Sequence, residues 1–228
     1  MFVFDPMYFL FILPAFLLGL WAQMRIHITY AQAQKLAAPL SGVAAARHIL
    51  DSAGLQNIEI EQIPGQLSDH YDSRKKVLRL SQDVYQNRTL AAVGIAAHEA
   101  GHAIQDAHAY ALLMVRNAAV PAAGIGSNIG ILLVILGAIF SFQYLILIGI
   151  GLFSCVVFFQ LVNLPVEFNA SNRAKAQLVQ LGIINERELV YVKKVLNAAA
   201  LTYVAATLQA ILTLLYLIMR FTGGSSRD

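Results

Sequence analysis

Long stretches without a charged residue alternate with charged segments along this chain. The uncharged stretches are Pro6–Met24, Asn117–Val166 and Val195–Met219. A helix needs about 20 apolar residues to cross a bilayer, so the first and third stretches each supply one span. The middle stretch of 50 residues supplies two. The pattern therefore predicts four transmembrane helices, over residues 6–24, 118–140, 144–164 and 198–219.

The charged segments between these spans have a mixed pattern. Apolar residues recur at helical spacing or alternate as in a strand, and Gly54 and Pro64 interrupt them. The predicted elements are a helix over 41–53, strands over 57–63 and 76–80, a helix over 87–109 and an amphipathic helix over 185–197. The fold class is therefore a mainly α membrane protein with a small α+β insert, forming a single domain over 1–228.

Composition and charge distribution indicate how the chain lies in a membrane. The mean hydropathy is +0.62 and only 13% of the residues are charged, against about 25% in soluble domains. Of 16 Lys and Arg residues, nine lie within 25–116, five within 166–197 and two after the last span. Positive residues favour the cytoplasmic side. We therefore expect a multi-pass protein of the cell membrane, with both charged segments in the cytoplasm and both termini outside.

The same distribution bears on processing and on partners. No Lys or Arg precedes the first apolar run, which favours a retained anchor over a cleaved signal peptide. The net charge of +3 reflects the positive residues that orient the chain in the membrane. The sequence has no basic groove with interleaved aromatic residues, which would indicate a nucleic-acid partner. The expected partners are the lipid bilayer and a protein or peptide substrate, which includes membrane proteins.

The strongest chemical signal is the pentad from His98 to His102, which reads H-E-x-x-H within a predicted helix. Side chains four positions apart share a helix face, so both imidazoles can bind one metal ion with Glu99 beside them as a base. The alternative is that the five-residue pattern arose by chance and that its histidines are only packed in the core. It is disfavoured because these polar groups emerge from a run of small apolar residues, where burial without a partner is costly.

Two histidines leave the coordination shell incomplete, since catalytic zinc usually takes three protein ligands and one water. His108 has the spacing of a metzincin third ligand, but Gln105 replaces the glycine of that motif. On a continuing helix, His108 points about 240° away from His102. Glu167 is the better candidate, because it is the first ionisable residue after the third span and the topology puts it on the same membrane face. A His-His-Glu shell with one Zn²⁺ per chain would be gluzincin-like.

Four segments resemble a known family. They are His98–Asp106 (HEAGHAIQD), Leu164–Ser171 (LPVEFNAS), Ser68–Asp72 (SDHYD) and Val77–Ser81 (VLRLS). Together they are similar to bacterial neutral zinc metallopeptidases of the YugP-like type, over nearly the whole chain. The site also resembles that of HtpX-like membrane proteases.

The HtpX-like proteases carry an aspartate where this chain has Ser171. A carboxylate that orients a ligand histidine from that position is therefore missing. Asp106 lies one turn after His102 and is a candidate to orient a ligand histidine in its place. The equal alternative is that Asp106 is only an acidic residue on the protein surface.

The resemblance implies an integral-membrane zinc endopeptidase, in which a zinc-activated water attacks the peptide and Glu99 acts as general base. Candidates for contacting the substrate or the tetrahedral oxyanion are His70, Tyr71 and Arg173. Two alternatives stay open. One is a membrane zinc hydrolase of a non-peptide substrate, and the other is a non-enzymatic membrane scaffold with a retained metal site. Glu99 argues against the scaffold, because a structural zinc site needs no base.

Overall fold

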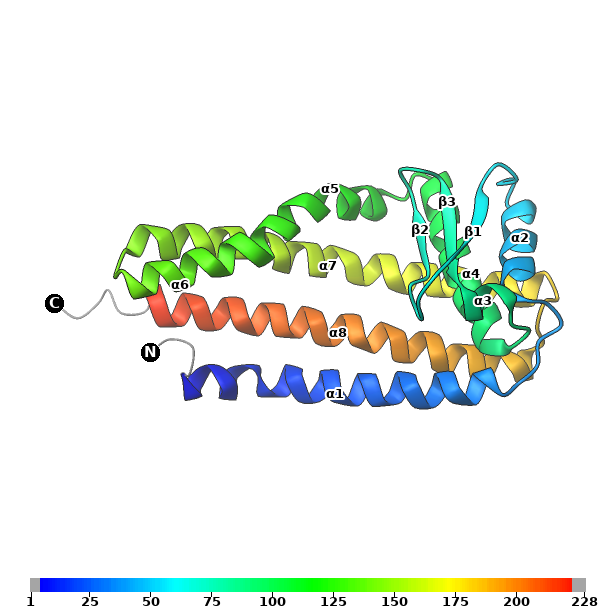
Figure 1. Ribbon diagram of the computed structural model, residues 1–228, viewed down its shortest axis with the longest axis horizontal. Coiled ribbons are helices and arrows are strands. Elements are labelled where there is room, and N and C mark those ends of the chain that lie inside the picture. Colours follow the sequence, from blue (N-terminus) through cyan, green and yellow to red (C-terminus); the bar gives the residue numbers. More distant parts are fainter. Residues whose placement is uncertain (1–4, 223–228) are drawn as a thin grey trace. The chain divides into compact units, whose positions relative to one another are not determined.

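The computed structural model describes residues 5–222 (Figure 1). The chain is mainly helical, with one small sheet. The helices are α1 (Pro6–Gln34), α2 (Gly42–Ser52), α3 (Gln82–Gln86), α4 (Leu90–Ala107), α5 (Ala111–Ile125), a π-helical turn (Gly126–Gly130), α6 (Ile131–Ile139), α7 (Gln143–Gln180) and α8 (Glu186–Thr222). The strands are β1 (Glu59–Ile63), β2 (His70–Asp72) and β3 (Val77–Ser81). The chain divides into two compact units, and parts of α1, α5, α7 and α8 belong to each.

Among the described residues, the first unit comprises 5–22, 115–165 and 201–222. Its core joins α6, α7 and α8 through apolar residues, among them Val134, Phe153 and Leu217. Four helices of the described chain are long and apolar enough to cross a membrane: α1, the α5–α6 pair, α7 and α8. The structure thus offers four candidate spans, the number that the sequence predicts.

The second unit comprises residues 23–114 and 166–200. Its sheet has the order β1-β3-β2, with β1 parallel and β2 antiparallel to β3. The fully buried Leu78 and Leu80 of β3 join a core that includes small residues of α4, together with residues of α2, α7 and α8. Figure 1 shows β2, β3 and β1 side by side next to α4. This unit holds the H-E-x-x-H helix within the packed core of an α+β fold.

Several local predictions agree with the structure. Ser41 caps α2 by accepting a hydrogen bond from the backbone of Ala44, and Gly54 adopts a positive φ just after this helix. Asn185 and Glu188 form the expected reciprocal capping box at the start of α8.

Two helices are longer than the predicted elements. Helix α7 continues through Pro165 to Gln180, and α8 joins the predicted amphipathic helix and the last span in one element. A proline within a helix costs about 3 kcal/mol. Here the turn after Pro165 is stabilised by burial, since Val166 and Ala170 are completely buried. Strand β2 and the short helix α3 were not predicted. The predicted positions of the two termini fall on residues 1–4 and 223–228, outside the described residues.

Candidate metal centre

Helix α4 holds the two histidines at fixed positions. It begins after Thr89, whose hydroxyl accepts a hydrogen bond from the backbone N–H of Ala92. It ends where Ala109 adopts a positive φ and Tyr110 donates its N–H to the carbonyl of Gln105, which is a Schellman end. One turn apart on this helix, His98 and His102 place their ring centroids 4.8 Å from each other.

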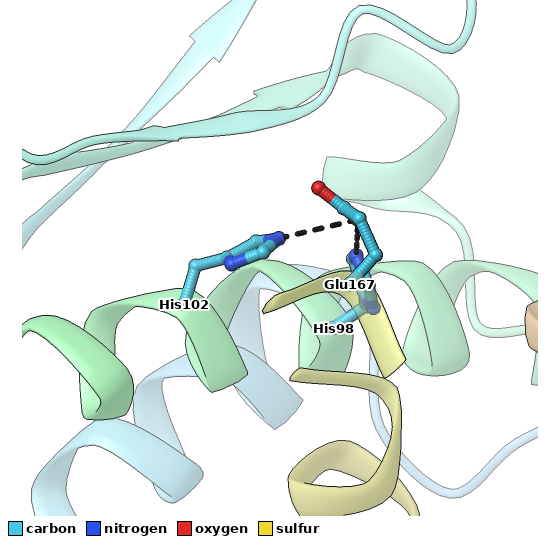
Figure 2. A group of neighbouring side chains, drawn as sticks. All are labelled: His98, His102 and Glu167. Atoms are coloured by element: carbon cyan, nitrogen blue, oxygen red, sulfur yellow. Dashed lines mark hydrogen bonds and ion pairs between the residues drawn. The ribbon is translucent and has the colours of Figure 1, made fainter. Parts of the chain in front are cut away.

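Helix α7 brings a carboxylate to the same point. Oε2 of Glu167 lies 3.3 Å from Nε2 of His98 and 3.6 Å from Nε2 of His102. Figure 2 shows the three side chains directed toward one another, the histidines from α4 and Glu167 from α7. His102 and Glu167 are buried and His98 is half-buried. Residues 69 positions apart in the sequence thus form one compact cluster.

The cluster has the donor set of a zinc site. One ligand atom from each of His98, His102 and Glu167 can be chosen so that all three lie within 4.8 Å of one another. A tetrahedral zinc with bonds of about 2.1 Å separates its ligand atoms by about 3.4 Å, close to the two distances from Oε2 of Glu167 to the histidine Nε2 atoms. Two imidazoles and one carboxylate leave a fourth position open, as in catalytic zinc sites. Among the described residues, this is the one group of three such donors.

Each histidine also has a partner on its second ring nitrogen. Nδ1 of His98 lies 3.1 Å from the hydroxyl of Ser171, and Nδ1 of His102 lies 2.9 Å from Oε1 of Gln105. Both Nε2 atoms therefore face Glu167 while both Nδ1 atoms are hydrogen-bonded. Such contacts orient metal-binding imidazoles.

Burial and opposite charge act together on the ionisable groups of the cluster. Burial alone would raise the pKa of Glu167, but hydrogen bonds and charges from His102 and His98 hold it well below its usual range. For His102, burial lowers the pKa, and the carboxylates of Glu167 and Glu99 outweigh this and raise it. Glu99 is 8% exposed, and its charge acts on His102. An ionised Glu167 suits the binding of a cation.

Gly101 permits the close approach of α4 to α7. A methyl group at this position would lie 2.7 Å from the backbone carbonyl oxygen of Ala170, one turn after Glu167. A backbone atom cannot move aside as a flexible side chain can. The glycine within the pentad therefore has a packing reason, since it allows Glu167 to reach the two histidines.

We expect Gly101→Ala to lower the free energy of unfolding by about 1–3 kcal/mol, as overpacking does, and to weaken zinc binding by forcing α4 and α7 apart. Thermal melting and chelator competition on the purified protein measure both effects. Gly124→Ala is the matched control, because a methyl group on Gly124 meets nothing within 4 Å. The control should melt no lower than the parent protein, since alanine is the better helix former. Equal behaviour of the two variants would contradict the packing role.

His108 and Asp106 lie apart from the cluster. His108 caps the end of α4, and its Nδ1 lies 3.4 Å from Nη1 of Arg173. The carboxylate of Asp106 accepts hydrogen bonds from the hydroxyl of Tyr71 and from Lys76. No hydrogen bond joins it to either histidine in the described part of the chain. Asp106 thus links α4 to the β2–β3 hairpin, and the orienting contacts predicted for it are made by Ser171 and Gln105.

The three candidates for substrate or oxyanion contacts take different positions. Tyr71 donates its hydroxyl to Asp106, and burial and this carboxylate raise its pKa well above the usual range. His70 precedes it on β2 and so faces the opposite side of the sheet, where its Nδ1 bonds the carbonyl of Ser68. Arg173 donates Nε–H to Asn169. Tyr71 is the one of these that β2 directs toward α4.

Sequence reasoning missed Ser171 and Gln105 as partners of the histidines, and Asn169 behind them. A signal for two of them was available in the spacing. Gln105 lies three residues after His102 and Ser171 lies four after Glu167, which places each on the face of its helix that carries a proposed ligand.

Comparison with known proteins identifies the family of this chain. The chain belongs to the family described as "Putative neutral zinc metallopeptidase", whose model matches residues 8–222. It is similar to a Bacillus subtilis (strain 168) protein described as "Putative membrane protease YugP", with 43% identity over 225 residues, covering 97% of this chain and 100% of the relative. No solved structure matches the chain significantly. The family assignment thus agrees with the resemblance carried by the sequence motifs.

Proposed function

We propose that this protein is an integral-membrane zinc endopeptidase whose site consists of His98, His102, Glu167 and Glu99. The observation that carries the proposal is the convergence of two Nε2 atoms and one carboxylate oxygen from α4 and α7. Family membership supports both zinc and peptide hydrolysis. One ion per chain is expected, because the described residues offer one such group of donors.

Each residue has a distinct proposed role. His98, His102 and Glu167 would hold the zinc, which when bound supplies a Lewis acid that acidifies water and polarises the scissile carbonyl. Glu99 is not one of the three converging donors, so its carboxylate would accept the proton of the attacking water and pass it to the leaving amine. A carboxylate base next to a ligand histidine in the sequence distinguishes this arrangement from a structural zinc site.

Strand β2 supports a peptide as the substrate. It forms one edge of the sheet, since the strand order is β1-β3-β2, and Tyr71 ties it to α4 through Asp106. An edge strand beside a catalytic helix can align an extended peptide by backbone hydrogen bonds. This feature favours peptide hydrolysis over a non-peptide substrate.

Cleavage of casein and of detergent-solubilised membrane proteins tests this function. The purified full-length protein should cleave such substrates, lose the activity with a chelator and regain it with zinc. A zinc-loaded protein that hydrolyses no peptide would contradict the proposal and would favour the non-peptide hydrolase or the scaffold.

We further propose that the site faces the cytoplasm and that the whole chain acts as a single domain. Charge distribution supports this orientation, since 14 of the 16 Lys and Arg residues lie in the two charged segments. Reporter fusions after Gln66 and after Arg187 should read as cytoplasmic, and a fusion after Asp228 as external. The opposite pattern would reverse the orientation, and opposite sides for the first two would contradict the site itself, because His98 and Glu167 must share a face.

A further inference from the structure

The hydrogen bonds around Gln105 have only one consistent set of donors and acceptors. This side chain is completely buried, so its amide must be satisfied within the protein. Its Nε2 lies 2.8 Å from the backbone carbonyl oxygen of Val166 and 3.0 Å from Oδ1 of Asn169. A backbone carbonyl can only accept a hydrogen bond. The NH₂ group of Gln105 must therefore face Val166, which fixes the orientation of the amide.

Asn169 is fixed in the same way by Arg173. Nε–H of Arg173 is always a donor and lies 2.8 Å from Oδ1 of Asn169. The oxygen of Asn169 therefore accepts from Arg173 on one side and from Gln105 on the other. Because both N–H groups of Gln105 are used, its Oε1 is left as an acceptor.

This arrangement determines which nitrogen of His102 carries a proton. Oε1 of Gln105 lies 2.9 Å from Nδ1 of His102, so Nδ1 must be the donor. In a neutral imidazole with a protonated Nδ1, the lone pair is on Nε2. That atom faces Oε2 of Glu167 and is the one positioned for a metal.

His98 differs from His102 in this respect. Its Nδ1 meets the hydroxyl of Ser171, which can donate as well as accept. Ser171 therefore orients His98 without deciding where the proton lies. The proton position is therefore fixed at His102 and not at His98. The chain of hydrogen bonds that begins at Arg173 ends at His102.

We infer that Gln105 is a positioning residue, which holds His102 with Nδ1 protonated and the Nε2 lone pair directed at the zinc position, and that Asn169 and Arg173 hold Gln105 in turn. The same amide binds the carbonyl of Val166, the residue before Glu167. Gln105 thus fixes a histidine ligand on α4 and the segment of α7 that carries the carboxylate ligand. The inference rests on the proposed function, since it concerns the ligands of that site.

The test is zinc affinity of the full-length protein in detergent, measured by chelator competition. Gln105→Met keeps the length of the side chain and removes its hydrogen bonds, and it should raise the zinc dissociation constant by about 10–100-fold, as loss of an outer-shell partner does. Gln180→Met, an exposed glutamine on α7, is the matched control and should bind zinc as the parent protein does. If Gln105→Met does not fold, Asn169→Leu tests the next link, with a smaller increase expected.

Nitrogen-15 NMR of histidine in the zinc-loaded protein gives a readout that a packing role would not move. The parent protein should show a slowly exchanging proton on Nδ1 of His102, and in Gln105→Met this proton should exchange faster, because its hydrogen-bond acceptor is gone. Unchanged zinc affinity in both variants, or a proton on Nε2 of His102 in the parent, would overturn the inference alone. Absence of zinc binding by the parent protein, or zinc retained by His102→Ala, would instead overturn the proposed site.

Discussion

Glu99→Gln is expected to retain zinc and to lose peptide cleavage by at least ~10²-fold, the effect typical of removing a general base. Glutamine has the same size and reach as glutamate but cannot accept the proton of the attacking water. Glu99 is also not among the three converging donors, so the metal should stay. Turnover of a peptide substrate, zinc content and melting temperature of the two proteins measure these effects together.

The same variant separates the enzyme from a scaffold. A scaffold role should survive the change, since folding and metal binding would be preserved. Undiminished cleavage by a folded, zinc-loaded Glu99→Gln protein would remove Glu99 as the base.

Glu167→Ala should lose most of the bound zinc. The carboxylate is 3% exposed, it is the one acidic member of the cluster, and its Oε2 faces both Nε2 atoms. Its removal leaves two imidazoles, one ligand fewer than a catalytic zinc usually has. Metal analysis of the purified variant measures the loss.

His108→Ala is the matched control for this change. His108 lies at the end of α4 beside Arg173, and it has the metzincin spacing that makes it the competing third ligand. The control should retain zinc. Normal zinc content in Glu167→Ala, or a loss in His108→Ala, would contradict the His-His-Glu assignment.

Features that depend on neighbouring residues could be predicted from the sequence. Transmembrane spans can be predicted from uncharged runs, because about 20 consecutive apolar residues are enough for a helix to cross a bilayer. The shared face of His98 and His102 follows from helical spacing. The helical phase also separates His108 from His102, and the structure places it beside Arg173 instead.

Features that depend on distant contacts could not be predicted in the same way. Strand β2 has three residues and exists through pairing with β3, so it leaves no apolar alternation in the sequence. Helix α7 continues past Pro165 because the next turn is packed in a core, which local propensity does not report.

The orienting partners of the histidines show this limit most clearly. Gln105 was visible in the sequence only as a residue in place of a motif glycine. Its meaning comes from Val166 and Asn169, which lie about 60 positions away on α7. Asp106 was the more obvious candidate because it carries a charge, yet its partners are Tyr71 and Lys76. Residues of α4 and α7 come this close because Gly101 allows the two helices to pack tightly.

Peptide hydrolysis in water enriched in oxygen-18 tests the central claim most directly. The zinc-loaded full-length protein is incubated with casein, and the fragments are identified by mass spectrometry. The proposed mechanism predicts one oxygen-18 atom in each new C-terminal carboxylate, in fragments that disappear with a chelator and return with zinc. Absence of fragments from the zinc-loaded protein, or fragments that form equally without zinc, would contradict a zinc endopeptidase.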